Sequence, residues 1–150
     1  MDLRRGFDSF TRGYIAKGWD PNADEKRRNI GARRRFKIMK KLLDVKHGDR
    51  VIIPNLSLDT DDDNNYFTIA EVAEGYSFEP LPKIDDMGHH LTVTPESLVS
   101  YSYYENNLTT QLAEKLRGLY PYGAAVSRIG ETNAYLRDVI EQLLRLKRKP

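Results

Sequence analysis

Apolar positions in the last third of the chain recur at helical spacing. Leu112, Leu116 and Leu119 are separated by four and three positions, which places them on one face of a helix. A second apolar stripe at helical spacing consists of Leu136, Val139, Ile140, Leu143 and Leu144. It runs into the cations Arg145, Lys147, Arg148 and Lys149, and such residues in a last turn complement the helix dipole without needing a partner. Residues 105–150 are therefore predicted to be helical.

The middle of the chain has the pattern of β-strands. Gly48 and Asp49 form a turn signal before the continuous apolar run Val51–Ile53, which is typical of a strand buried on both faces. Pro54 then ends the strand. Phe67–Val72 is predicted to be its partner, and the polar, acidic segment between them, Leu58–Asn65, a surface loop.

Further strands are predicted beyond residue 72. Gly75 is expected to turn the chain into the short strand Tyr76–Phe78, and His89–Val93 has strand character. Thr94 and Pro95 provide an N-cap and a first-turn proline for a short helical turn through Leu98. The last strand is expected at Val99–Tyr104.

The first third of the chain is predicted to contain a basic helix that ends at Leu43. Phe36, Met39 and Leu43 share one face of this helix. The other faces carry Arg33, Arg34, Lys37, Lys40 and Lys41. Asn22, with Glu25 three positions later, has the form of a capping box, although Gly31 interrupts the helix. Before the helix, Tyr14–Trp19 is predicted to be a short strand that ends at Asp20-Pro21 and places Trp19 at its terminus.

Length and composition favour one α+β domain. A chain of 150 residues with 39% hydrophobic residues can bury one core. Its zones are the N-terminal strand and basic helix (1–47), the sheet (48–104) and the helical segment (105–150). No run approaches the roughly 18 apolar residues of a membrane span, the first residues lack a signal-peptide pattern, and cysteine is absent. We therefore expect a cytoplasmic protein that does not enter a membrane.

Charge is strongly segregated along the chain. Residues 1–50 hold 15 Lys and Arg against 7 Asp and Glu, residues 51–110 hold 1 against 11, and residues 111–150 hold 8 against 4. Two interpretations remain open. The basic helix contacts a polyanion such as nucleic acid, or its cations form a solvated surface beside an acidic sheet.

Candidate catalytic and metal-binding residues do not form a recognisable set. Asp59, Asp61, Asp63 and Asn65 copy the first half of a calcium loop, but Asn64 stands where glycine is needed and Ala70 where a bidentate carboxylate is required. His89 and His90 are adjacent and point to opposite faces of a strand. No phosphate loop, nucleophile elbow or nuclease-type Glu/Gln-x-Lys triplet is present. We expect a protein that is not an enzyme and that holds no metal and no cofactor.

Aromatic residues accompany the predicted strands. They are Trp19, Phe67, Tyr76, Phe78, Tyr101, Tyr103 and Tyr104. Most aromatics in a sheet pack in the core, but some can form a cage for a flipped or unpaired base. Trp19 at a strand end, and Tyr76 with Phe78 on one strand face, are the candidates for that second role.

The order of these motifs resembles a known family over about residues 13–94. The motifs are, in chain order, Gly18-Trp19, Gly48-Asp49-Arg50-Val51-Ile52-Ile53-Pro54, Ile69-Ala70-Glu71-Val72 followed by Tyr76 and Phe78, and Gly88-His89. This order is similar to that of the PUA-like and EVE-like barrels attached to modification-dependent restriction systems of the Mrr and McrBC kinds. The resemblance implies a small β-barrel flanked by basic helices that reads a modified or flipped base in DNA or RNA, DNA being the expected nucleic acid. This chain differs from the family pattern in its acidic loop Asp59–Asp63, which would repel phosphate.

The resulting hypothesis is a non-catalytic reader of nucleic acid. The expected base pocket consists of Trp19, Tyr76, Phe78 and His89, where His89 either hydrogen-bonds a base edge or has a structural role in its strand. The expected phosphate contacts are Arg33, Arg34, Arg35, Lys37 and Lys41. The alternative is a protein-interaction module, in which an exposed apolar stripe of the C-terminal helix docks on a partner or on a second copy.

Overall fold

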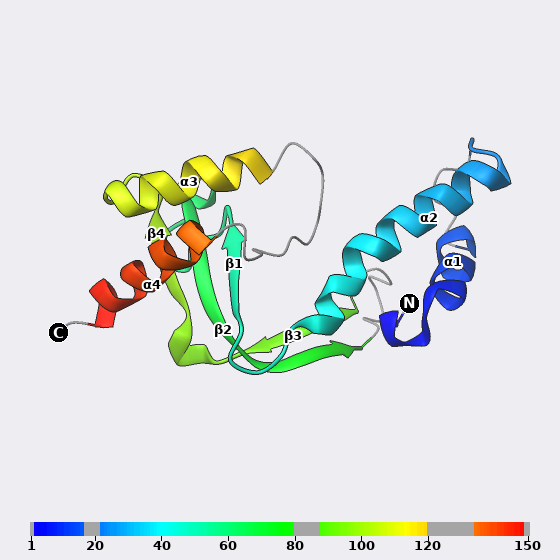
Figure 1. Ribbon diagram of the computed structural model, residues 1–150, viewed down its shortest axis with the longest axis horizontal. Helices are drawn as coiled ribbons and strands as arrows, with labels where there is room; N and C mark the ends of the chain where they lie inside the picture. The colour runs from blue at the N-terminus through cyan, green and yellow to red at the C-terminus, as the bar shows by residue number, and fades with distance from the viewer. Residues whose placement is uncertain (1, 17–21, 80–87, 120–133, 149–150) are drawn as a thin grey trace. The chain divides into compact units, whose positions relative to one another are not determined.

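The computed structural model describes residues 2–16, 22–79, 88–119 and 134–148 (Figure 1). The chain divides into two compact units, which are described separately. Unit 1 comprises Met1–Asp49 and Val72–Val93, and unit 2 comprises Arg50–Glu71 and Thr94–Pro150. Among the helices of the described ranges, none combines the length and apolar character that crossing a bilayer requires.

Unit 2 contains three antiparallel strands. The first part of β2 (Tyr66–Phe78) pairs with β1 (Arg50–Pro54) and with β4 (Val99–Ser102). The strands predicted around residues 51–53, 67–72 and 99–104 are therefore present. The expectation that β1 is buried on both faces is wrong, since Ile53 is 38% exposed. The physical reason is that successive side chains of a strand point to opposite faces, so Ile52 packs against the core cluster and Ile53 points away from it.

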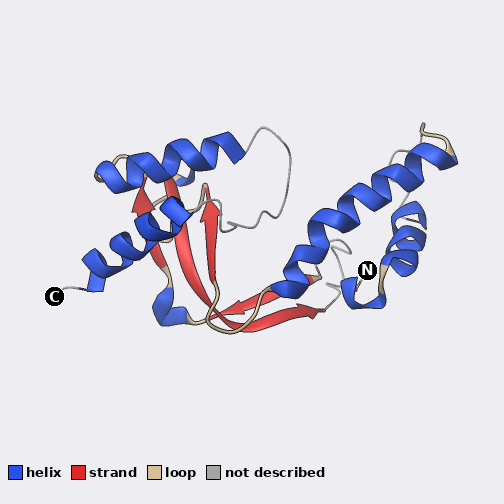
Figure 2. Cartoon of the chain, viewed as in Figure 1, coloured by secondary structure: helices blue, strands red, loops and turns tan. Residues whose placement is uncertain are grey.

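Two helices complete the core of unit 2 (Figure 2). α3 (Asn107–Leu119) and α4 (Ala134–Arg148) lie where the periodicity predicts them. The apolar stripe of α4 from Leu136 to Leu144 is buried in one cluster with Leu112 and Phe67. At the end of α4, Lys147 Nζ lies 4.9 Å from the centre of the Tyr101 ring and donates to the Ser100 carbonyl at 3.3 Å. The C-terminal stripe is thus part of the core.

The segments that precede β2 and β4 also agree with the predictions from the sequence. The acidic segment between β1 and β2 is mostly exposed and ends in the short 3-10 helix η3 (Asp63–Asn65). The proline turn before β4 is the 3-10 helix η4 (Pro95–Ser97), as predicted. Beneath the acidic segment, buried Thr68 donates to the Leu56 carbonyl at 2.9 Å, and its hydroxyl lies 2.8 Å from that of Ser100.

Unit 1 begins with helices where a strand was expected. The 3-10 helix η1 (Leu3–Arg5) is followed by α1 (Phe7–Ala16), so the prediction of a strand from Tyr14 is wrong for its described part. Leu3, Phe10 and Tyr14 are buried, and with Phe7 they recur at steps of four, three and four, which is helical periodicity. Trp19 and Asp20-Pro21 lie outside the described residues.

The basic helix of unit 1 is α2 (Glu25–Met39), extended by the 3-10 helix η2 (Lys40–Asp44). It ends close to the predicted Leu43. Its N-cap is Asp24, whose carboxylate accepts the Arg27 N–H at 2.8 Å, and not the predicted Asn22. Ala32 is buried against α1, with Phe36 and Met39 packed on the same cluster.

The second part of β2 belongs to unit 1 and pairs with β3 (His89–Val93). The predicted turn at Gly75 is wrong, because β2 continues unbroken to Phe78. The requirement for glycine comes from packing, since a Cβ at Gly75 would lie 2.8 Å from the Val45 carbonyl oxygen.

The four strands do not close into a barrel. The sheet is antiparallel with the path β1-β2-β3, and β4 also pairs with β2. Closure would require the outer strands to pair with each other, but β1, β3 and β4 each pair only with β2 among the described strands. The mixed α and β character is as predicted, whereas the expected closed barrel is wrong.

Candidate functional site

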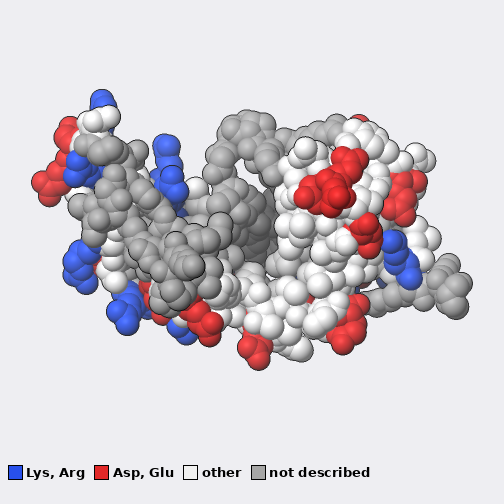
Figure 3. All heavy atoms as spheres, turned by 180° about the vertical axis from the view of Figure 1, so that it is seen from behind, with Lys and Arg blue, Asp and Glu red and all other residues white. Residues whose placement is uncertain are grey.

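The helix α2 carries the densest cationic surface among the described residues. Its only acidic residue is Glu25. The exposed cations of α2 are Lys26, Arg27, Arg33, Arg34, Arg35 and Lys37. Lys40 and Lys41 continue the series in η2, where Lys41 is half-buried. In Figure 3, Lys and Arg side chains project from unit 1 with some Asp and Glu among them, and a cluster of Asp and Glu lies on the surface of unit 2.

The buried residues of α2 determine which cations point away from the core. Ala32 and Phe36 face α1, and at about 100° per residue Arg34 and Lys37 fall on the opposite side. Arg27 and Lys41 lie seven positions before and after Arg34 and therefore share its face. We call Arg27, Arg34, Lys37 and Lys41 the cationic stripe. It extends for about 21 Å at the helical rise of 1.5 Å per residue.

The other two predicted phosphate ligands flank the buried face instead. The Arg33 guanidinium carbon lies 5.6 Å from the centre of the Phe7 ring, and that of Arg35 lies 6.0 Å from the centre of the Tyr14 ring. Stacking on an aromatic face restricts a guanidinium while its N–H groups still point outward in the plane. All five predicted residues thus lie on one helix and its extension, but on different sides of it.

Like charges on α2 oppose its own stability. Lys37 has Arg33 and Arg34 at four and three positions before it, and Lys40 and Lys41 at three and four positions after it. Side chains at these spacings are neighbours, and pairs of equal charge destabilise a helix. No ion pair of Arg34 or Lys37 with a carboxylate is present among the described residues. A merely solvated helix face usually alternates the two signs, so folding alone does not explain this cluster.

A shallow depression adjoins the cationic stripe on the first half of α2. Its volume is about 430 Å³, and it is lined by Glu25, Lys26, Asn29, Ile30 and Arg33. Ile30 is 56% exposed. The depression therefore combines one carboxylate, one amide, two cations and one exposed apolar side chain.

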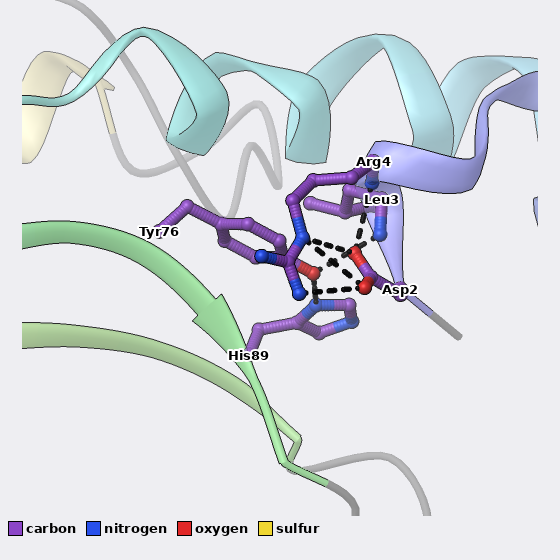
Figure 4. Close-up of polar contacts among 5 residues, drawn as sticks. All are labelled: Asp2, Leu3, Arg4, Tyr76 and His89. Atoms are coloured by element: carbon purple, nitrogen blue, oxygen red, sulfur yellow. Dashed lines mark hydrogen bonds and ion pairs between the residues drawn. The ribbon is translucent and has the colours of Figure 1, made fainter.

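Three of the four predicted base-pocket residues meet on β2 and β3. Phe78 and His89 are direct partners across the strands, with ring centres 5.3 Å apart. The Tyr76 hydroxyl lies 2.8 Å from His89 Nδ1 and also accepts the Leu3 N–H at 3.0 Å (Figure 4). Because the hydroxyl accepts from Leu3, its own hydrogen can be donated to Nδ1, which corresponds to the Nε2–H tautomer of the imidazole.

The N-terminal segment covers part of this aromatic group. The Arg4 guanidinium carbon lies 5.7 Å from the centre of the Tyr76 ring, and the same guanidinium pairs with the Asp2 carboxylate at 2.8 Å. Hydrogen bonding to Arg4 lowers the pKa of Asp2, and burial raises the pKa of the Tyr76 hydroxyl. The described contacts of Tyr76 therefore hold the start of the chain against the strands.

The acidic segment before β2 is organised by contacts within itself. The Asp63 carboxylate accepts the Ser57 N–H at 2.9 Å, and the Asn65 amide donates to the Asp62 carboxylate at 2.9 Å. Within the described parts of the chain, no three His, Asp or Glu side chains converge as metal ligands would.

The residues of this surface that the sequence did not single out include Lys26, Arg27, Asn29 and Ile30. Arg27 could have been found from the seven-residue steps that join it to Arg34 and Lys41. Asn29 has no comparable signal, because its placement beside Arg33 matters only once the buried face of α2 is known.

Comparison with protein-family models, with curated proteins and with solved structures gives no match for this chain. The resemblance to PUA-like and EVE-like domains thus stands on the sequence motifs alone.

Proposed function

We propose that the protein binds nucleic acid through the cationic stripe of α2. The observation that supports this proposal is the accumulation of like charge around Lys37, on the face opposite the buried Ala32 and Phe36. Repulsion among these side chains is relieved when phosphate groups neutralise them. A polyanion with regularly spaced phosphates matches a line of cations better than a compact anion does.

The expected binding is electrostatic and strongly salt-dependent. Each neutralised phosphate of a duplex contributes a slope of about −0.9 to the dependence of log affinity on log salt. Four stripe cations therefore predict a slope of about −3 to −4. Affinity should be measurable at low salt and should fall steeply toward physiological salt.

Titration of a labelled 20-base-pair duplex at several salt concentrations tests the proposal. The double variant Arg34→Gln with Lys37→Gln should reduce the slope by about 2. The matched control, Arg137→Gln with Arg145→Gln, removes two exposed cations from α4 in unit 2 and should leave the slope unchanged. Circular dichroism checks that both variants stay folded. Wild-type binding that is absent or independent of salt, or an equal loss in the control, would overturn the proposal.

The contacts of Tyr76, Phe78 and His89 do not enter this proposal, since the Tyr76 hydroxyl, which also contacts His89, accepts the Leu3 N–H of the N-terminal segment. The protein-interaction alternative depended on an exposed apolar stripe near the C-terminus. In α4 this stripe is buried, with Val139 2% and Leu143 1% exposed. No observation on the described surface favours that alternative over nucleic-acid binding.

A further inference from the structure

We infer that α2 enters the major groove of B-form duplex DNA and reads base edges through the depression on its first half. The residues concerned are Lys26, Asn29, Ile30 and Arg33, which we call the reading patch. This inference rests on the proposed function and extends it, because it names the nucleic acid and predicts sequence preference.

The chemistry of the reading patch suits base edges better than phosphates. Glu25 lines the same depression, and a carboxylate there would repel a phosphate group. Asparagine pairs with the adenine edge, arginine with the guanine edge, and an apolar side chain contacts the thymine methyl group. Glu25 itself can accept a hydrogen bond from the amino group of cytosine. These are the interactions by which proteins distinguish base pairs in the major groove.

Helical geometry aligns the reading residues along a groove. Asn29 and Arg33 are four positions apart, so they lie on one side of α2 with a rise of about 6 Å between them. This rise corresponds to about two base-pair steps of 3.4 Å. The Arg33 guanidinium also lies over the Phe7 ring, and such a contact reduces the entropy lost when the side chain binds.

The cationic stripe lies beside the reading patch on the same helix. Successive residues of a helix are about 100° apart around its axis, so Arg34 and Lys37 lie on the side of α2 next to the reading patch. A helix seated in the major groove has a sugar-phosphate backbone along its flank, and cations there neutralise phosphates while the patch faces the bases. The major groove is about 12 Å wide and accepts an α-helix, whereas side chains cannot read the deep, narrow major groove of A-form RNA.

Selection from a pool of randomised DNA duplexes tests the inference. The wild-type protein should enrich a defined sequence. Asn29→Ala, a change at an exposed position that favours helix formation, should lose the preference at one base pair by about 5- to 150-fold. Its salt slope on random duplex should stay unchanged. Lys37→Gln is the converse control, with a smaller salt slope and an unchanged sequence preference.

The outcomes separate the inference from the proposed function. Salt-dependent binding that is equal for all duplexes, or that is tighter for single-stranded DNA or duplex RNA, would overturn the inference and leave the proposed function standing. Unchanged preference in Asn29→Ala would also overturn it. Absence of binding to every nucleic acid would overturn both.

Discussion

The positive charge of Lys37 is expected to lower the stability of the fold and to strengthen the binding of nucleic acid. Replacing it with glutamine removes its charge and leaves a side chain of similar length and similar helix propensity. Because the Lys37 side chain is exposed, the substitution creates no cavity. The change in stability should therefore report on charge alone.

The magnitude follows from the four cations around it. Arg33, Arg34, Lys40 and Lys41 are each three or four positions from Lys37. A like-charge pair at such spacing costs about 0.2–0.5 kcal/mol at low salt. Lys37→Gln should therefore raise the free energy of unfolding by about 1–2 kcal/mol. For a chain of this length that corresponds to an increase in Tm of roughly 2–8 °C.

Thermal unfolding followed by circular dichroism at 20 mM and at 1 M NaCl measures this effect. The gain should be present at low salt and should nearly vanish at high salt, because the Debye length falls to about 3 Å at 1 M. Arg137→Gln, an exposed change on α4, is the matched control and should leave Tm nearly unchanged. The same Lys37 variant should bind duplex DNA more weakly than the wild type.

A lower or unchanged Tm for Lys37→Gln at low salt would refute this reasoning. It would mean that the positive charges of α2 are already compensated within the folded chain. The charge pattern would then be a feature of folding and would no longer support nucleic-acid binding. A gain that persists at high salt would show that the effect is not electrostatic.

Three further substitutions test the packing that positions the site. Tyr76→Phe leaves the Leu3 N–H without its acceptor and should cost about 1–2 kcal/mol in chemical denaturation, whereas Tyr66→Phe on the same strand should cost less than about 0.5 kcal/mol. Leu143→Ala should destabilise the chain by about 2–5 kcal/mol, since this side chain is 1% exposed; near-wild-type stability would contradict the burial of the α4 stripe. Gly75→Ala should cost about 1–3 kcal/mol, because the new methyl group would press on a backbone carbonyl 2.8 Å away; an unchanged denaturation midpoint would show that the two segments do not approach.

The elements that the sequence predicts well are those defined by their own periodicity. The stripe from Leu136 to Leu144 indicates α4, and the apolar run Val51–Ile53 indicates β1. The steps from Phe7 to Tyr14 carry the same kind of signal. The residues around Tyr14 favour a strand by their own propensity, but the burial of Phe10 and Tyr14 with Ala32 occurs in the helix α1.

The cations of the candidate site were also visible in the sequence, but their roles were not. Arg33, Arg34 and Arg35 are three consecutive arginines, and the sequence does not distinguish their roles. Burial of Ala32 and Phe36 directs Arg34 outward and leaves Arg33 and Arg35 beside the aromatic rings of α1. A helix places three successive side chains about 100° apart, so only knowledge of the buried face distinguishes them.

The C-terminal helices, the main strands and the concentration of positive charge near residues 26–41 follow from the sequence alone. Three features are visible only in the three-dimensional structure: β2 continues through Gly75 to Phe78, the sheet stays open, and Tyr76 holds the N-terminal segment. The physical reason is the range of the interactions. Side-chain periodicity depends on residues that are close in the sequence. The residues that pair with a strand, pack against a glycine or hydrogen-bond a tyrosine hydroxyl come from distant parts of the chain, as Leu3 does for Tyr76.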